Sequence, residues 1–243
     1  MAELISYTLT EIALAGVGLL GLIESIRLSA DNGRYNKDPS QDDKNRQYVL
    51  TALQVETAVN FIAAFVYTKM IAEYKNNPKS KIILQLRYAD WVFTTPLLLL
   101  SLSMFLLKRE KSACAWVTWP KPQWVCTSNE EPKSWYLGLA LCAAVAMCVV
   151  GYRAELKRNV RLAVVSFVLL VAAFMLLLPY VIIKNVTVEQ RTVYSIVALL
   201  WCCYGFAWFM KNEQKRNIAY NSLDLLSKVG FGLYLWIHIR GII

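Results

Sequence analysis

The stretch Leu-Asp-Leu-Leu-Ser-Lys-Val-Gly-Phe-Gly-Leu-Tyr-Leu-Trp-Ile-His-Ile, residues 223–239, decides the fold. It is almost wholly apolar, yet Lys228 lies inside it. A cation at the middle of a bilayer costs about 2.5 to 3.5 kcal/mol. About ten residues, or about 15 Å of helix, separate Lys228 from either end of the longer predicted membrane segment, residues 217–240, which is too far for the amine to reach the headgroups. Asp224, four residues earlier, falls on the same helical face and is a natural counter-charge.

A lysine buried beside a carboxylate has two interpretations. One is a structural ion pair between helices, and the other is an amine that forms a Schiff base with a carbonyl ligand. Structural pairs perturb lysines as well, so Lys228 and Asp224 alone leave both interpretations open.

The rest of the chain has the composition of a membrane protein. Of its 243 residues, 57% are hydrophobic and only 18% are charged. Segments long enough to cross a bilayer recur seven times. They are residues 5–28, 48–72, 81–107, 134–152, 160–183, 190–212 and 217–240. We therefore predict an all-α integral membrane protein, with residues 1–243 forming one seven-transmembrane helix bundle.

The charges of the chain are consistent with a membrane location. The net charge of +9 suits loops that touch anionic lipid headgroups, and no nucleic-acid-binding motif gives it another meaning. The first segment lacks a basic leader and carries Glu3 and Glu11, so we expect a retained helix and not a cleaved signal peptide. Basic residues divide almost evenly between the two sides, which leaves the orientation open.

The cysteines and the single histidine predict no metal site. Four cysteines lie in apolar segments, where they act as small hydrophobes: Cys142, Cys148, Cys202 and Cys203. Cys114 and Cys126 lie in the long loop 108–133, and would pair if that loop were outside the cytoplasm and stay reduced if it were inside. His238 is expected at headgroup level. With no nucleophilic triad or phosphate-binding loop either, we predict no enzyme.

The third segment carries a second polar cluster. Arg87, Asp90, Thr94 and Ser101 are spaced by 3, 4 and 7 residues, so they line one helical face. Arg87 alone would be read as part of an interfacial ion pair with Asp90. Asp90 lies deeper, and a carboxylate inside the membrane indicates a functional site. The sixth segment adds Trp201, Tyr204 and Trp208 at helical spacing. Opposite an internal lysine and two aspartates, they suggest the wall of a site for a long conjugated ligand.

Three of these stretches resemble the microbial (type 1) rhodopsins. Arg-Tyr-Ala-Asp-Trp-Val-Phe-Thr-Thr-Pro-Leu-Leu-Leu-Leu, residues 87–100, resembles their third helix. Trp201-x-x-Tyr204-Gly205-x-x-Trp208 resembles their sixth helix, and residues 223–232 resemble their seventh. The motifs occur in the expected order, in the third, sixth and seventh of seven segments.

The resemblance implies a role for each of these residues. Lys228 would bind all-trans-retinal as a protonated Schiff base, with Asp90 as counterion and proton acceptor and Asp224 as second counterion. Arg87 would balance these charges from the extracellular side, and Thr94 would hydrogen-bond Asp90. Further residues would line the retinal pocket: Trp91, Thr95, Trp201, Tyr204 and Trp208. The resemblance also implies an extracellular N-terminus and a cytoplasmic C-terminus.

The departures from the family pattern bear on mechanism. Ser101 stands where proton pumps of the family have a carboxylate that returns a proton, and a serine hydroxyl does not release one near neutral pH. Asp90, Thr94 and Ser101 form a D-T-S pattern similar to that of rhodopsins carried by giant viruses, which would imply a host-cell membrane. Gly205 replaces a kink proline. The fifth segment has no tryptophan, so Phe167 or Phe174 would pack against the ring.

Two more positions concern proton exit and gating. Glu213 lies in the family's proton-release region, but Arg216 stands near the second expected carboxylate. The second segment carries Gln54, Glu56, Thr57 and Asn60, and Glu56 lies near the middle of its apolar span. It is similar to the central-gate glutamate of channelrhodopsins, with Asn221 or Asn60 as its expected partner. Alternatively, Glu56 is a neutral buried residue or a proton donor.

These observations predict a light-driven ion transporter, first of all an outward proton pump. The alternative is a light-gated cation channel, and a sensory photoreceptor is less favoured because the chain carries no transducer domain. The expected partners are retinal, the lipid bilayer and the transported protons or cations. The sequence leaves the oligomeric state open, with a homo-oligomer as one option.

Overall fold

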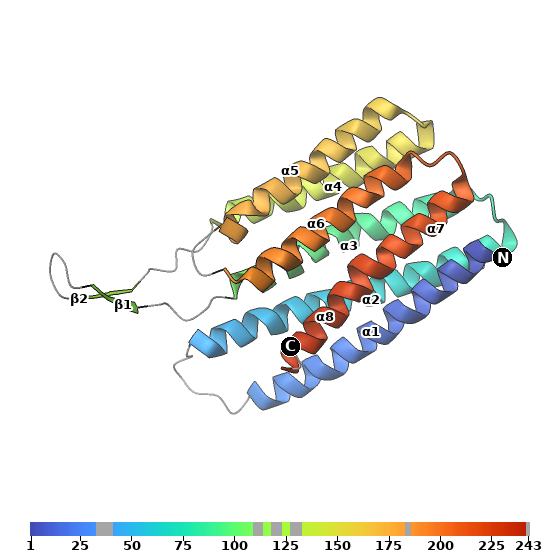
Figure 1. Ribbon diagram of the computed structural model, residues 1–243. Helices are drawn as coiled ribbons and strands as arrows, with labels where there is room; N and C mark the ends of the chain where they lie inside the picture. Colours follow the sequence, from blue (N-terminus) through green and yellow to red (C-terminus); the bar gives the residue numbers. More distant parts are fainter. Residues whose placement is uncertain (33–40, 109–113, 118–122, 127–132, 183–185, 242–243) are drawn as a thin grey trace.

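The computed structural model describes residues 1–32, 41–108, 114–117, 123–126, 133–182 and 186–241. Six helices are α1 (Ala2–Asn32), α2 (Gln41–Asn76), α3 (Lys81–Leu107), α4 (Ser134–Lys157), α5 (Val160–Ile182) and α6 (Val188–Trp208). A seventh rod joins α7 (Glu213–Asp224), the π-helix η1 (Leu225–Val229) and α8 (Gly230–Ile239). These rods lie side by side (Figure 1), so the predicted all-α seven-helix bundle is confirmed.

The rods alternate in direction along the chain, which gives the bundle two distinct ends. We call the end where α1 and α3 begin the N-side, and the end where α3 and α8 finish the C-side. The two termini lie at these opposite ends (Figure 1).

Five of the described helices, α1 to α5, are long and apolar enough to cross a membrane. Large apolar side chains also point outward from the bundle. Among the exposed ones are Phe93, Val168, Leu199 and Phe206. An apolar outer surface of this kind matches lipid and not water.

Polar side chains fix where two of the helices begin. Ser80 caps α3, because its hydroxyl accepts a hydrogen bond from the Ile82 amide at 3.2 Å. Thr187 and Gln190 form a capping box at the start of α6. The Gln190 side chain also donates to the carbonyls of Phe105 and Lys108, both at 2.8 Å, and so satisfies the end of α3. The sixth helix therefore runs from Val188 to Trp208, a few residues earlier than predicted.

A short β-ribbon is an addition to the predicted fold. Strands β1 (Cys114–Val117) and β2 (Gln123–Cys126) pair antiparallel within the segment expected to be a plain loop. Cys114 is registered opposite Cys126. The sequence left both the paired and the reduced state of these two cysteines open.

The interior differs between the two halves of the bundle. The C-side half is packed with apolar side chains from α2 to α6 and α8. They include Leu98, Leu99, Leu102, Phe105, Leu106, Phe174, Leu177, Val197 and Leu235. The N-side half has a smaller apolar cluster between α1, α2 and α3, beside many buried polar groups. The functional residues lie where these two halves meet.

Candidate functional site

Lys228 lies in the π-helix and is 2% exposed. Its Nζ atom is 2.5 Å from Asp90 Oδ2 and 3.7 Å from Asp224 Oδ1. The two carboxylates expected near this amine are thus both present, and Asp90 is the closer one. A π-helical turn inside an α-helix is often found at a functional site, since it breaks the regular spacing of side chains.

Asp224 is held by donors from three other helices. Its carboxylate accepts hydrogen bonds from Tyr67 of α2 at 2.7 Å, Trp91 of α3 at 3.1 Å and Tyr204 of α6 at 2.7 Å. Hydrogen bonds of this kind stabilise a buried carboxylate in its charged form.

Asp90 has fewer partners than Asp224. Among the described residues its Oδ1 atom has no hydrogen-bond partner, and Lys228 is the one donor to Oδ2. The Thr94 hydroxyl does not reach this carboxylate, contrary to the prediction. It donates instead to the Asp90 main-chain carbonyl at 2.9 Å, because a threonine in a helix bonds readily to the carbonyl four residues earlier. Asp90 is therefore the carboxylate better placed to accept a proton from Lys228.

Arg87 is buried on the N-side of these carboxylates. Its Nη1 atom donates to Asn221 Oδ1 at 2.9 Å and its Nη2 atom donates to the Tyr7 hydroxyl at 3.1 Å. Its guanidinium also lies over the ring of Tyr220. In the described part of the chain, Arg87 has no direct ion pair and reaches Asp224 through Asn221 and Tyr67.

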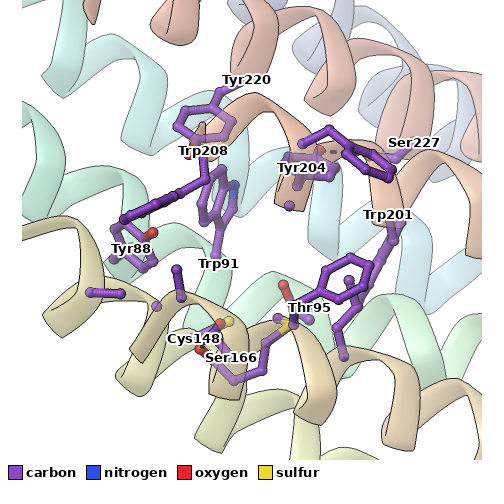
Figure 2. A pocket seen from close by; sticks show the side chains of 18 of the residues that line it. Tyr88, Trp91, Thr95, Cys148, Ser166, Trp201, Tyr204, Trp208, Tyr220 and Ser227 are labelled. Atoms are coloured by element: carbon purple, nitrogen blue, oxygen red, sulfur yellow. Dashed lines mark hydrogen bonds between the residues drawn. The ribbon is translucent and has the colours of Figure 1, made fainter. Parts of the chain in front are cut away.

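An aromatic-lined cavity of about 190 Å³ opens beside the Lys228 amine. All five predicted pocket residues line it: Trp91, Thr95, Trp201, Tyr204 and Trp208. Figure 2 shows them with Tyr88, Cys148 and Tyr220, and with the hydrogen bond of 3.0 Å between Tyr204 and Ser227. The cavity is mainly apolar, with its charged groups gathered at Lys228 and Asp224.

Both candidate phenylalanines of α5 pack against α6. Phe174 meets the Trp201 ring edge-on, with 5.4 Å between the ring centroids. Phe167 lines the cavity and lies against Gly205. A Cβ atom at position 205 would be only 2.5 Å from Phe167 Cδ2, so the missing side chain of Gly205 makes room for this ring.

Glu56 lies in the interior of the bundle and is 0% exposed. Its Oε1 atom accepts a hydrogen bond of 3.4 Å from Asn60, and Oε2 has no partner among the described residues. The expected contact with Asn221 is absent from the described chain. The Asn221 amide donates to Ser6 and its oxygen accepts from Arg87 and Tyr67, on the N-side of Asp224. Of the two predicted partners, Asn60 is the correct one.

Glu213 is exposed in the first turn of α7 and takes no part in this network. The buried carboxylate near Arg216 is Glu155 of α4, which the sequence analysis missed. Glu155 accepts hydrogen bonds from Arg216 Nε at 2.9 Å and from the Tyr88 hydroxyl at 3.0 Å. A glutamate at the end of an apolar segment looks like an interfacial residue, and no local pattern predicts this contact between α4 and α7.

Seven helices around a buried lysine, two carboxylates and an aromatic cavity define the class of the microbial (type 1) rhodopsins. The chain belongs to the family of bacteriorhodopsin-like proteins, whose model matches residues 36–241. Members of this family are integral membrane proteins that bind retinal and use light for ion transport or sensing.

Curated relatives agree with this family. Archaerhodopsin-2 of Halobacterium sp. (strain aus-2) is 27% identical over 166 residues, which cover 61% of this chain and 55% of the relative. Bacteriorhodopsin of Haloterrigena sp. (strain arg-4) is 26% identical over 219 residues, which cover 80% of this chain and 76% of the relative.

Solved structures share the fold along the whole chain. The viral rhodopsin OLPVRII has a TM-score of 0.73 and 24% identity, with 100% of both chains covered. The proton-pumping rhodopsin AR2 of the marine alga Acetabularia acetabulum has a TM-score of 0.69 and 17% identity, over 100% of this chain and 96% of that one. The inward proton pump xenorhodopsin has a TM-score of 0.66 and 18% identity, over 97% of this chain and 93% of that one. Since proteins of this one fold include an inward pump, the fold alone does not set the direction of transport.

Proposed function

We propose that the protein is a light-driven outward proton pump, with its N-side facing outward and its C-side facing the cytoplasm. It would be a transporter and not an enzyme, in a host-cell membrane if the chain is viral. One observation carries this proposal: the Lys228 amine is 2.5 Å from a poorly satisfied Asp90 carboxylate, where a polar N-side half meets an apolar C-side half.

The residues of the cavity fit all-trans-retinal. Lys228 would hold it through a Schiff base, and the flat rings of Trp91, Trp201, Tyr204 and Trp208 would enclose the polyene. When bound, retinal would absorb light and isomerise, and this would change the environment of the proton on the Lys228 nitrogen. Two of the residues that line this cavity, Trp201 and Trp208, have indole nitrogens without a hydrogen-bond partner among the described residues.

The proton moves first from Lys228 to Asp90. The distance of 2.5 Å makes this transfer direct, and Asp90 has one oxygen free to accept. Asp224 is a poorer acceptor, because Tyr67, Trp91 and Tyr204 already stabilise its charged form. Transfer to Asp90 moves the proton toward Arg87 and the N-side.

The packing of the bundle gives the transport its direction. Buried polar groups connect the Lys228 region with the N-side, whereas leucines and phenylalanines make up most of the C-side interior, around the buried polar groups Glu56, Asn60 and Ser101. Apolar packing keeps out water and makes a charge costly there, so a proton released on the N-side does not return by the C-side. Reprotonation of Lys228 must cross this apolar region past Ser101.

Ser101 makes the return of the proton slow. Its hydroxyl is buried and donates to the Ala52 carbonyl at 2.8 Å, tying α3 to α2 without offering a proton. We expect the return to the dark spectrum to slow as the pH of the C-side medium rises. Ser101→Asp should speed this return about tenfold or more at pH 8 and flatten its pH dependence, as flash photolysis would measure.

Ser101→Asn is the matched control, since asparagine has the size of aspartate but no proton to give. It should keep the pH dependence of the parent. A parent whose return is already fast at every pH would contradict this role and would point to Glu56 as an internal donor.

A light-gated cation channel is the second candidate, and Glu56 is the residue that favours it. A buried carboxyl with one unpartnered oxygen is a weak point in the packing of α2. Gly232 of α8 lies next to it, where a Cβ atom would be 3.2 Å from Glu56 Cγ. In a channel, loss of the Asn60 contact would open a path for water and cations at this point.

Glu56→Gln separates the pump from the channel. In a pump, the substitution should change only kinetics, because glutamine can keep the Asn60 contact and Glu56 is not the proton acceptor. In a channel, it should change conductance or ion selectivity several-fold. The measurement is photocurrent across a voltage series, with sodium replaced by a large organic cation. Currents that keep one direction in both proteins support the pump, and a reversal potential that follows the sodium or proton gradient excludes it.

A further inference from the structure

A buried carboxylate on the N-side, Glu3 of α1, is connected to Arg87 through one hydroxyl group. Tyr7 accepts a hydrogen bond from Arg87 Nη2 at 3.1 Å and donates one to Glu3 Oε1 at 3.4 Å. The Tyr7 ring is 0% exposed and Glu3 is 6% exposed. Hydrogen bonds therefore join Glu3, in the first turn of α1, through Tyr7 to Arg87 in the interior of the bundle. We call these three residues the relay.

Glu3 is held in place from two more helices. Asn217 of α7 donates to Glu3 Oε1 at 2.8 Å, and Tyr74 of α2 donates to Oε2 at 3.4 Å. These donors are all neutral, and within the described chain no cation lies at ion-pair distance from Glu3. The buried cation to which the hydrogen bonds of Glu3 lead is Arg87, through the Tyr7 hydroxyl.

The other described carboxylates near the N-side are not linked to Arg87 through Tyr7 as Glu3 is. Glu155 forms an ion pair with Arg216 at 2.9 Å, and among the described residues its hydrogen-bond partners are Arg216, Tyr88 and Tyr220, not Tyr7. Glu213 is exposed and lies outside the network. Glu11, two turns further along α1, bonds to Thr68 on the outer surface.

We propose that Glu3 is a positioning residue that sets, through Tyr7, how strongly Arg87 acts on Asp90. Arg87 and Asp90 are three residues apart on one face of α3, so the guanidinium stabilises the charged carboxylate. The Glu3 carboxylate orients the Tyr7 hydroxyl and draws the guanidinium toward the N-side. This inference rests on the proposed function, in which Asp90 is the counterion of a chromophore on Lys228.

Other charged and titratable groups also act on Arg87, and these groups are the same in every variant. They are Tyr67 of α2, Asp224 of α7 and Glu155 of α4, with Tyr220 of α7 against the guanidinium face. The test must therefore change Glu3 and Tyr7 and leave these groups in place.

The acid-induced colour change of the dark protein is the readout. Acid protonates Asp90 and shifts the absorption to the red, so the midpoint of this transition reports the stability of the charged carboxylate. Without the charge of Glu3, Arg87 is freer to stabilise charged Asp90, and more acid is needed to protonate it. Glu3→Gln should therefore lower the midpoint, by about 0.5 to 1 pH unit for a charge at this range.

The relay also predicts that Glu3 and Tyr7 are not independent. Tyr7→Phe breaks the link while leaving the Glu3 charge in place. The shift caused by Glu3→Gln should shrink to less than half in the Tyr7→Phe background. Equal shifts in both backgrounds would mean that Glu3 acts only as a distant charge, and would overturn the relay.

Two controls match these variants. Tyr74→Phe removes a hydroxyl that contacts Glu3 but not Arg87, and Glu11→Gln removes a carboxylate of α1 outside the relay; both should keep the midpoint of the parent. An unchanged midpoint in Glu3→Gln would overturn the inference while leaving the proposed function intact. Failure of the proposed function looks different, since a parent without visible absorption has no colour change to titrate.

Discussion

Lys228→Ala is expected to give a protein without visible absorption after all-trans-retinal is added. The amine of Lys228 is buried beside the aromatic cavity and is the nucleophile that would form the link to retinal. The parent should absorb visible light, and borohydride should fix the label to Lys228, which mass spectrometry of peptides would locate. Loss of colour should be complete, because no second lysine lines this cavity in the described chain.

The substitution also leaves Asp90 and Asp224 without their buried cation. Removing one partner of a buried ion pair destabilises a protein by about 3 to 5 kcal/mol. The double variant Lys228→Ala with Asp90→Asn leaves one buried carboxylate without a cation instead of two, so most of this destabilisation is avoided. It tests the link between Lys228 and retinal in a protein that is better able to fold. Lys69→Ala, on the outer surface over Phe65, should keep full colour. Colour in Lys228→Ala without an added amine would contradict the assignment.

Asp90→Asn should shift the absorption to the red at every pH and abolish net proton transport. The Asp90 carboxylate stabilises the cation at Lys228 in the ground state, so its loss raises that state most and narrows the gap to the excited state. Without the acceptor 2.5 Å away, light-driven proton release should fall by about a hundredfold or more. Absorption spectra and light-induced pH changes in vesicles would measure the two effects.

Asp224→Asn is the matched comparison for this prediction. Asp224 is 3.7 Å from the amine and is satisfied by three other donors, so its removal should affect transport less. If Asp90→Asn kept the parent spectrum at neutral pH, Asp224 would be the dominant counterion instead.

The residues that the sequence placed well belong to single helices. Arg87, Asp90 and Thr94 share one face of α3, and helical spacing alone brings them together. The same holds for the aromatic residues of α6. The contact of Asp224 with Lys228 was expected from a spacing of four residues, and it exists. The closer partner is Asp90, from a different helix; the resemblance implied this contact, which the spacing within one helix does not give.

The residues that sequence reasoning missed depend on how helices pack against one another. Tyr7, Tyr67 and Glu3 come from α1 and α2, and their distances to α3 and α7 follow from the rotation and depth of whole helices. The periodicity of a single segment gives neither the rotation nor the depth of its helix. The same reason explains why Asn221, one of the two expected partners of Glu56, lies instead one helical turn to the N-side of Asp224, among the partners of Arg87.

The contact between Phe167 and Gly205 has a consequence for how related chains can change. The phenyl ring fills the space that a side chain at position 205 would need, so the two positions share one volume between α5 and α6. A larger residue at 205 would require the Phe167 ring to shift or a smaller residue at 167, and a smaller residue at 167 alone would leave a void beside Gly205. The two positions, far apart in the sequence, are therefore expected to vary together, and a proline at 205 would need the Phe167 ring to move or to be replaced.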